Sequence, residues 1–292
     1  MRKISKLIPN FILRFREDFL IKTYANRYKT EILNFIKSTD FHYGDQGVLY
    51  EYIKNNGIHV FPYSFTKKYD YNSVKVHFDH SCNLYYVIHK GKKLYYKRGM
   101  SVRQIQRRYN MSLIEQDPES AHSYVDNNFV IKNGSVLTDI GVAEGNFSLD
   151  NIEKVSHVHL FEADSSWIEA LEKTFEPWKN KVTINNKFVS NKLDESHTTI
   201  DEYFNKVKLD FIKIDVDGGE RNLLNGADQT LNRSNLKIAL CTYHNQNDWS
   251  DFRTLLSKYS NNITSSPNYM LFYFDPNFRA PYFRKGIMRI ET

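Results

Sequence analysis

Two glycines follow an apolar run near the middle of the chain, in the stretch TDIGVAEGNFS. Gly141 and Gly145 form G-x-x-x-G, which differs from the G-x-G-x-x-G that brings backbone amides onto a pyrophosphate. A nucleoside also needs an acid at the end of the next strand, about 20 residues downstream, to accept hydrogen bonds from its ribose hydroxyls. Glu162 in HLFEAD occupies that position. The two motifs together predict a nucleoside-containing cofactor without a pyrophosphate.

S-adenosylmethionine fits this prediction, because it joins an adenosine to an amino acid and carries a sulfonium cation where a dinucleotide carries phosphates. Asp139 ends the first strand and would face the methionine end of this cofactor. The alternative role of Asp139 is an N-cap for the turn that follows it. Methyl transfer to a hydroxyl then requires an aligned acceptor and a group that removes the hydroxyl proton.

A second group of chemically active residues falls at the ends of two later apolar runs. In FIKIDVDGGE, the alternate residues Phe211, Lys213 and Asp215 share one strand face, and the next run ends at His244. When the first, fourth and fifth strands of a doubly wound sheet are neighbours, their ends lie about 5 Å apart per step. We therefore predict that His244 is the general base and that Asp215 orients it, acts as the base itself, or helps it bind a metal. Lys213 joins this catalytic group as a charged partner of Asp215, unless it ends its strand in solvent.

Asp217 and Glu220 follow directly and are predicted to contact the substrate. Both also flank a helix start, where capping explains carboxylates equally well. A divalent ion held by Asp215 and His244 would need further oxygens from these two residues or from the substrate. Metal binding therefore stays an alternative rather than a prediction.

These residues require a scaffold, and the chain after residue 130 alternates strands with helices. Strands separated by helices of this length form parallel crossover units, which predicts an α/β fold with a doubly wound, Rossmann-like, mostly parallel sheet. Ligands of such sheets bind at the carboxyl ends of the strands. The runs 269–274 and 286–291 are predicted as an antiparallel C-terminal strand pair at one edge. The expected strands are 135–140, 158–164, 182–189, 209–216 and 236–244, and the expected helices are 146–155, 165–178, 197–206 and 219–232.

The chain before residue 125 has a different texture, because Tyr and Phe crowd short extended runs there. We expect antiparallel strands after an opening helix or two, hence an N-terminal α+β region over 1–125 and a cofactor-binding domain over 126–292. The extended runs are 57–65, 75–79, 83–89 and 92–98.

The segment that joins the two regions, 113–125, is predicted to lie over the cleft and to help form the acceptor pocket. Its candidate substrate contacts are Glu115, Gln116, His122 and Tyr124. Near the C-terminus, PYFRKG carries Arg284 and Lys285, which either meet an anionic substrate group or form a solvated turn.

From about residue 128 to 245 the sequence resembles the FkbM-type, class I S-adenosylmethionine-dependent methyltransferases. The resemblance rests on VLTDIGVAEGNFSL, HLFEAD, TTIDEYF, FIKIDVDGGERNLLNGA and CTYHNQND. The chain departs from the family pattern at Val142 and Ala143 in the glycine motif, at Ala163, where Pro is usual, and at Gly219, where Ala is frequent.

The resemblance implies a set of cofactor contacts for the chain. Residues at the methionine end would be Asp139, Gly141, Glu144, Gly145 and Asn146, with Asp215 nearby. Glu162 would bind the ribose, and Ala163, Asp164 and Trp167 would flank the adenosine. Phe188, Val189 and Ser190 would contact the adenine, although Phe188 suits a core position equally well.

Composition excludes several other classes. The 292 residues carry 40 Lys and Arg against 34 Asp and Glu, a balance too even to predict nucleic-acid binding. Cys82 and Cys241 are too few and too far apart for a disulfide framework, which favours a reducing, cytoplasmic location. Residues 1–29 mix apolar and basic side chains but contain no span long enough to cross a membrane. This stretch is expected to pack on the protein as a helix, or else to rest on the inner, anionic face of the membrane.

We predict an O-methyltransferase for a sugar hydroxyl of a surface glycan, such as a capsule or O-antigen, or of its precursor. The acceptor follows from the habit of the family and from the aromatic first half of the chain. The alternatives are methylation of a small natural product and a non-catalytic glycan-binding scaffold with this fold. NAD-dependent chemistry is disfavoured because the middle glycine is missing. The sequence sets neither the acceptor sugar nor the oligomeric state.

Overall fold

The computed structural model describes residues 28–38 and 46–292. The N-terminal stretch 1–29, expected to pack as a helix or else to rest on a membrane, lies almost wholly in residues 1–27, outside the described residues. Within the described part of the chain, no helix has both the length and the apolar character needed to span a bilayer.

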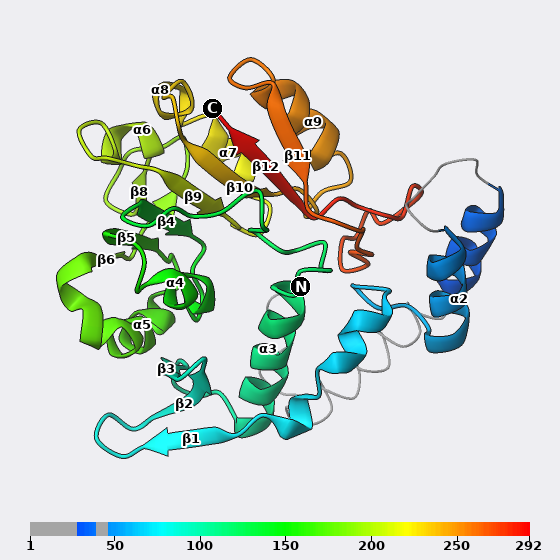
Figure 1. Ribbon diagram of the computed structural model, residues 1–292, viewed down its shortest axis with the longest axis horizontal. Helices are drawn as coiled ribbons and strands as arrows, with labels where there is room; N and C mark the ends of the chain where they lie inside the picture. The colour runs from blue at the N-terminus through cyan, green and yellow to red at the C-terminus, as the bar shows by residue number, and fades with distance from the viewer. Residues whose placement is uncertain (1–27, 39–45) are drawn as a thin grey trace, which may run out of the picture.

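The centre of the molecule is a seven-stranded sheet with the order β11-β12-β10-β9-β4-β5-β6 (Figure 1). Strands β4, β5, β6, β9 and β10 run parallel to one another, whereas β12 is antiparallel to both β10 and β11. The doubly wound sheet with an antiparallel C-terminal pair is thus confirmed, as is the adjacency of the first, fourth and fifth strands, here β4, β9 and β10. The bounds are β4 Val136–Ile140, β5 His157–Phe161, β6 Val182–Asn185, β9 Phe211–Ile214, β10 Lys237–Cys241, β11 Asn262–Ser265 and β12 Ile287–Glu291.

The helices between these strands are shorter than the sequence predicts. The expected helix 219–232 is broken into two at Gly226, where a Cβ atom would lie 2.3 Å from the backbone oxygen of Ser190. A glycine is needed there to let the two backbones approach. The α-helices are α4 Asn146–Asn151, α5 Ile168–Phe175, α6 Ile200–Tyr203, α7 Glu220–Leu224, α8 Asp228–Leu231 and α9 Asp248–Leu256, and 3₁₀ turns Ser165–Trp167 and Glu176–Lys181 flank α5.

Two strand predictions were wrong in detail. The run 182–189 divides into β6 and a separate strand β7 (Phe188–Val189), which pairs in parallel with β8 (His197–Thr198). The run 269–274 is not the partner of the last strand, because β11 takes that place. Residue Leu271 instead donates its backbone N–H to the oxygen of Val60 and packs in a core cluster with the N-terminal helices.

The N-terminal region combines helices with a small antiparallel sheet, order β1-β2-β3, below the central sheet in Figure 1. The run 57–65, predicted as extended, contains a bend and a 3₁₀ turn because Pro62 cannot donate to a strand ladder. Helix α3 begins with a capping box between Ser101 and Gln104. The elements are a helix at 28–38, α2 Gln46–Asn56, 3₁₀ turns Ser64–Lys68 and Tyr71–Ser73, β1 Val76–Asp79, β2 Leu84–His89, β3 Lys92–Tyr95 and α3 Val102–Glu115.

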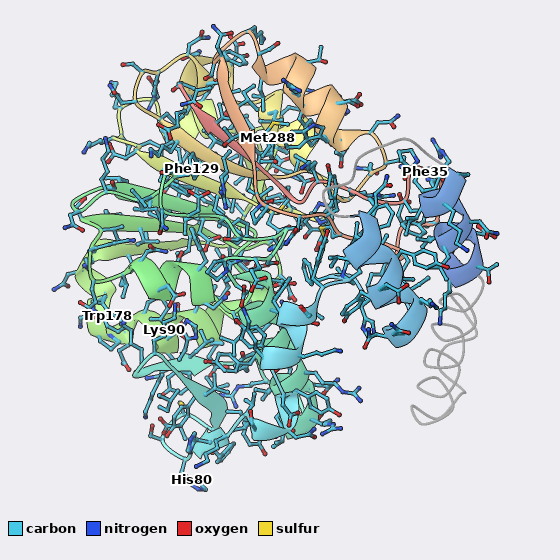
Figure 2. All side chains as sticks on the ribbon, turned by 45° about the vertical axis from the view of Figure 1, so that its right-hand side comes forward. Phe35, His80, Lys90, Phe129, Trp178 and Met288 are labelled. Carbon is cyan, nitrogen blue, oxygen red and sulfur yellow. The ribbon has the colours of Figure 1, made fainter. Side chains whose placement is uncertain are left out.

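The two faces of the central sheet are buried in different core clusters. One cluster contains Leu137 and Phe211 together with side chains of the N-terminal region, and the other contains Ile140 and Ile212 together with α7, α8 and α9. Figure 2 shows the side chains that fill these layers; its labelled Phe129 belongs to the first cluster and Met288 to the second. Because side chains alternate along a strand, the polar residues two positions after Leu137 and Phe211 project toward the N-terminal region.

Candidate active site

A cavity of about 680 Å³ opens at the carboxyl ends of β4, β5 and β9. Most of the residues singled out from the sequence line it, from both halves of the chain. The exceptions are Gly145, His122, Glu220 and His244, which lie outside the cavity wall. The singled-out residues that line it are Asp139, Gly141, Glu144, Asn146, Glu162, Ala163, Asp164, Trp167, Phe188, Val189, Ser190, Lys213, Asp215, Asp217, Glu115, Gln116 and Tyr124.

The glycine turn after β4 is shaped by close backbone packing. Gly141 has φ +75°, and a Cβ atom there would lie 1.7 Å from the backbone oxygen of Asp215. Gly145 has φ +83° and packs on Leu171 and Phe175 of α5, so it shapes the turn without facing the cavity. Both positions therefore demand glycine, for two different neighbours.

Asp139 and Lys213 form a buried ion pair across β4 and β9, where the register places them side by side. Nζ of Lys213 lies 2.9 Å from Oδ1 of Asp139 and donates to the backbone oxygen of Gly141 at 2.5 Å. Burial opposes the charged form, but the carboxylates of Asp139 and Asp215 raise the pKa of Lys213 above its usual value. The alternative that Lys213 ends its strand in solvent is wrong, because its side chain is only 5 % exposed.

Glu162 is a carboxylate held in place by backbone amides at the end of β5. Its Oε2 accepts from Ala143 N at 2.7 Å, and its Oε1 accepts from Asp164 N at 2.8 Å. Each carboxylate oxygen has a second lone pair, which leaves acceptor capacity toward the cavity. The residue thus ties the glycine turn to β5 and can still bind a pair of hydroxyls.

Arg108 of α3 is a cavity residue that the sequence reasoning missed. Its Nε donates to Oε2 of Glu144 at 2.6 Å, and its guanidinium lies 5.1 Å from the ring of Trp167. Lys97 approaches the same ring at 4.9 Å while it pairs with Asp164 at 2.6 Å. The sequence around Arg108 contains no recognisable motif. The residue reaches the cavity from α3, which precedes the part of the chain where strands and helices alternate.

At the other end of the cavity, Asp215 collects contacts from four side chains. Tyr124 donates to its Oδ2 at 2.8 Å, and Tyr243, a second residue missed from sequence, donates to its Oδ1 at 3.4 Å. Nε2 of His122 lies 3.4 Å from Oδ2, and Nε2 of His244 lies 3.6 Å from Oδ1. Burial would raise the pKa of Asp215, but His122 and the charges of Lys213 and His244 hold it well below its usual range.

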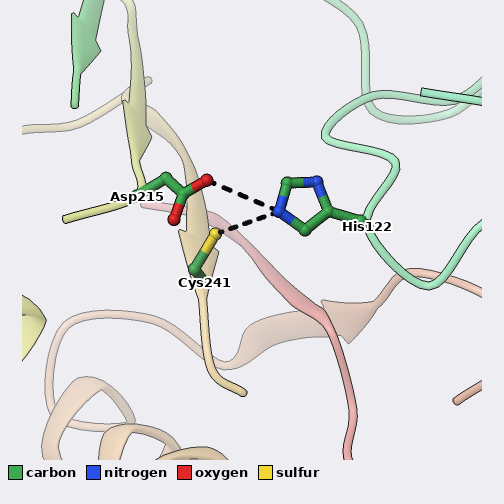
Figure 3. Close-up of side chains that lie close together, drawn as sticks. All are labelled: His122, Asp215 and Cys241. Atoms are coloured by element: carbon green, nitrogen blue, oxygen red, sulfur yellow. Dashed lines mark hydrogen bonds and ion pairs between the residues drawn. The ribbon is translucent and has the colours of Figure 1, made fainter. Parts of the chain in front are cut away.

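His122, Asp215 and Cys241 meet from three distant segments, as Figure 3 shows. Nε2 of His122 is 3.9 Å from the Cys241 sulfur and accepts or donates a hydrogen bond with Tyr243 at 3.1 Å. Burial raises the pKa of Cys241 well above its usual value, so the residue is a neutral thiol. His122 therefore supports Asp215 from behind the wall rather than contacting a substrate. Asp215, Asp217 and His244 make a second group with metal-ligand geometry, and they share Asp215 with the first.

His244 also lies behind the cavity wall, with a side chain that is 8 % exposed. Its Nδ1 is 3.0 Å from Oε1 of Glu220, whose carboxyl is fully buried and accepts from Val216 N. Burial lowers the pKa of His244, but Glu220, Asp215 and Asp217 together raise it above its usual value. Glu220 thus caps the turn into α7 and positions His244, and its buried carboxyl is out of reach of a substrate. Asp217 is fully exposed on the other side of the ring.

Glu115 is the last residue of α3. It differs from the other cavity carboxyls because its side chain has no hydrogen bond or ion pair with another residue of the described ranges. Burial raises the pKa of Glu115 to about 7, with smaller contributions from His122 and Arg108, which lower it, and Asp215 and Glu144, which raise it. A carboxyl with this pKa is half ionised near neutral pH, where a proton acceptor works best.

The doubly wound sheet, the glycine turn and the fixed carboxylate at the end of β5 define a Rossmann-like methyltransferase. Residues 56–263 match the Methyltransferase FkbM domain, and the chain therefore belongs to the FkbM methyltransferase family, as the sequence motifs predicted. This is a family of methyltransferases, and the family and its fold imply S-adenosylmethionine as the cofactor. A search of curated protein sequences found no match.

Solved structures with a similar arrangement include the methyltransferase FkbM from Methylobacillus flagellatus KT, with 15% identity and a TM-score of 0.45 over 65% of this chain and 54% of that one. This chain therefore spans about half the length of that protein. Precorrin-6y C5,15-methyltransferase from Geobacter metallireducens GS-15 has 12% identity and a TM-score of 0.39, over 67% of this chain and 90% of its own. Trm5b from Pyrococcus abyssi has 16% identity and a TM-score of 0.40, over 71% of this chain and 54% of its own.

The cavity residues fit this cofactor. Seven carboxyl groups but only three Lys or Arg side chains line the cavity, an imbalance that favours a cationic ligand such as a sulfonium. Glu162 keeps free acceptor capacity for ribose hydroxyls, and the turn at Gly141 leaves the end of β4 open. Phe188 is 54 % exposed, which favours contact with a ligand over the alternative of a core position.

Proposed function

We propose that the protein methylates a sugar hydroxyl of a surface glycan or of its precursor. The observation that carries this proposal is that a single cavity joins the cofactor residues to a polar wall of Glu115, Gln116 and Asp217. Carboxyl and amide groups of this kind recognise hydroxyls, since they supply acceptors and donors together. We place the reaction in the cytoplasm and expect no nucleic-acid partner.

S-adenosylmethionine supplies an activated methyl group when bound, so the chain must position the acceptor and remove its proton. Asp215 is held ionised by its tyrosine and histidine contacts and can accept a hydrogen bond that orients the acceptor hydroxyl. The low pKa that makes Asp215 a good anchor makes it a weak base. We propose that Glu115, uncommitted and with a pKa near neutrality, takes the proton on a carboxylate oxygen.

His244, which the sequence favours as the base, would act through Asp215, because Asp215 lies between it and the cavity. In this arrangement His244 stabilises the ionised carboxylate, and Glu220 holds the ring in place. The two assignments differ in a measurable way, since the limb of the pH profile that reports the base should disappear when the base itself is replaced.

The function is tested in a deletion strain that does not make this protein. Mass spectrometry of its surface polysaccharide should show the loss of one CH₂ unit from a sugar residue, and the purified protein should restore it with S-adenosylmethionine. An unchanged polysaccharide would contradict the glycan acceptor and would favour a small natural product instead. Calorimetry that finds no binding of S-adenosylhomocysteine would favour the non-catalytic scaffold.

A further inference from the structure

A second cavity, of about 460 Å³, adjoins the first one at the ends of β9 and β10. Asn222 of α7 lines both cavities. Along the turn before this helix, Asp217 and Gly219 line the first cavity and Gly218 lines the second, so this turn is a shared wall. The opposite side of the second cavity comes from the loop after β10 and from the segment before β12.

The floor of the second cavity is built from buried ionic groups. Arg284, only 4 % exposed, donates to Oδ2 of Asp275 at 2.5 Å, to Oε1 of Gln246 at 2.9 Å and to the backbone oxygen of Tyr243 at 2.6 Å. Neither sequence alternative for Arg284, a contact with substrate or a solvated turn, is therefore correct. Because one guanidinium joins the loop after β10 to the segment before β12, the cavity keeps its shape without a ligand.

Asp248 fixes the loop after β10 in the same way. Its buried carboxylate accepts from Asn245 N at 2.8 Å and from Asn245 Nδ2 at 3.1 Å. Gln246 is tied to the segment on the far side, because its Nε2 donates to the oxygen of Pro281 at 2.7 Å. The backbone around the cavity is thus held by side chains that are already committed.

The side chains above this floor are uncommitted. Four exposed residues have side chains that take part in no hydrogen bond or ion pair within the ranges that the structure describes. They are Asn222, Asn247, Asn277 and Arg279. Each amide offers donors and an acceptor, which suits a ligand with many hydroxyl groups. The charges of the lining residues nearly cancel, because three carboxylates (Asp248, Asp251 and Asp275) face two guanidinium groups (Arg221 and Arg279). A cavity with so little net positive charge is unsuited to a polyanion.

We propose that the second cavity is a subsite for a neighbouring sugar residue of an oligosaccharide acceptor. The sugar that is methylated lies in the first cavity against Asp215, and the chain continues across Asp217 and Gly218 into the amide-rich cavity. Arg279 provides a position for a single acidic group on that second sugar. This inference rests on the proposed function and extends it from a sugar hydroxyl to an acceptor of at least two residues.

The test uses di- and trisaccharide fragments of surface polysaccharide from the strain that lacks this chain. Saturation-transfer NMR and calorimetry follow their binding to the full chain with S-adenosylhomocysteine present. The variant N247A/R279A removes groups from two sides of the cavity. It should weaken fragment binding about tenfold or more, the value of one or two lost hydrogen bonds, and leave S-adenosylhomocysteine affinity unchanged. The matched control is R253A, an exposed arginine of α9 outside both cavities, which should change neither affinity.

Equal fragment affinity of N247A/R279A and the unaltered protein would overturn the subsite, as would fragments that fail to bind the unaltered protein while S-adenosylhomocysteine binds. These results are separate from a failure of the proposed function. If the polysaccharide of the deletion strain has lost no methyl group, the glycan acceptor itself is wrong. If the polysaccharide has lost a methyl group, and N247A/R279A binds the fragments as tightly as the unaltered protein, only the subsite is wrong.

Discussion

The two ends of the active-site cavity are built in different ways. At the cofactor end, the residues come from two consecutive strands: Asp139 from β4, Gly141 from the turn after β4, and Glu162 from the end of β5. Glu162 is held by two backbone amides. At the acceptor end, Glu115 and Asp215 come from distant segments, and Asp215 is held by side chains from two others, the segment 113–125 and the loop after β10. The cofactor end therefore depends on backbone geometry, and the acceptor end depends on tertiary packing.

This difference separates the expected effects of mutations. A change at the cofactor end should alter folding or cofactor affinity, because the backbone itself forms that site. A change at the acceptor end should alter turnover and leave cofactor affinity intact. Lys213 links the two ends of the cavity, since it pairs with Asp139 and also stabilises the ionised form of Asp215.

The largest effect is expected at the glycine turn. In G141A the new Cβ would meet the Asp215 backbone oxygen at 1.7 Å, so the end of β9 must move. The control is G134A, because Gly134 has the same φ of +75° but open space around it. G141A should lose about 3 kcal/mol more unfolding free energy than G134A in urea titrations. Equal losses would mean that the backbone contact carries no strain.

The next largest effect is expected in turnover. E115Q should lower the rate about 100-fold or more while S-adenosylhomocysteine affinity stays within twofold, because a general base contributes at least that much. In the unaltered protein the rate should rise with pH through about 7, the pKa of Glu115, and this limb should disappear in E115Q. If H244Q removes the limb and E115Q keeps it, His244 is the base.

Cofactor affinity provides a third comparison. E162A should weaken S-adenosylhomocysteine binding about 10- to 100-fold in calorimetry, the range for a lost hydrogen bond to a charged group. Turnover at saturating cofactor should fall far less. The control is E153A, because Glu153 is exposed and lines neither cavity. A large loss in turnover with normal affinity would place Glu162 at the chemical step instead.

A smaller effect is expected on stability. Burial raises the pKa of Glu115 from 4.5 to about 7, so the folded state holds its proton more tightly than the unfolded state. The contribution of this proton to the free energy of unfolding is present in full below pH 4.5 and is lost as pH rises through 7. E115Q should therefore gain unfolding free energy relative to the unaltered protein at pH 8, by at most about 3 kcal/mol, and little at pH 4. A gain independent of pH would show that charge burial is not its cause.

The smallest effect is expected from metal removal. Asp215 already accepts hydrogen bonds from Tyr124 and Tyr243, so its charge is stabilised without an ion. Dialysis against a chelator should change turnover less than about twofold, which is no more than a weak electrostatic interaction at the surface would cause. A strong loss that zinc or magnesium restores would favour a metal at His122, Asp215 and Cys241, or at Asp215, Asp217 and His244.

The sequence was sufficient for the parallel part of the sheet and for much of the cofactor end, but not for the edge strand β11. Apolar runs separated by helix-length segments predict the parallel order, since strands buried on both faces need that composition. The positions of Gly141 and Glu162 follow from where a strand ends, and both line the cavity. Periodicity placed Lys213 and Asp215 on one face, but it left the partner of Lys213 undecided, and the structure pairs it directly with Asp139.

What the sequence alone determined about this protein is local: where strands end, which turn needs glycine, and which acid follows the second strand. Only the tertiary structure decided that Arg108, Glu115 and Tyr243 meet at one cavity and that His244 lies behind Asp215. The physical reason is that a strand end is specified by its own few residues through backbone hydrogen bonding. A contact between side chains more than a hundred residues apart depends on how whole layers pack, and no periodicity in the chain encodes it.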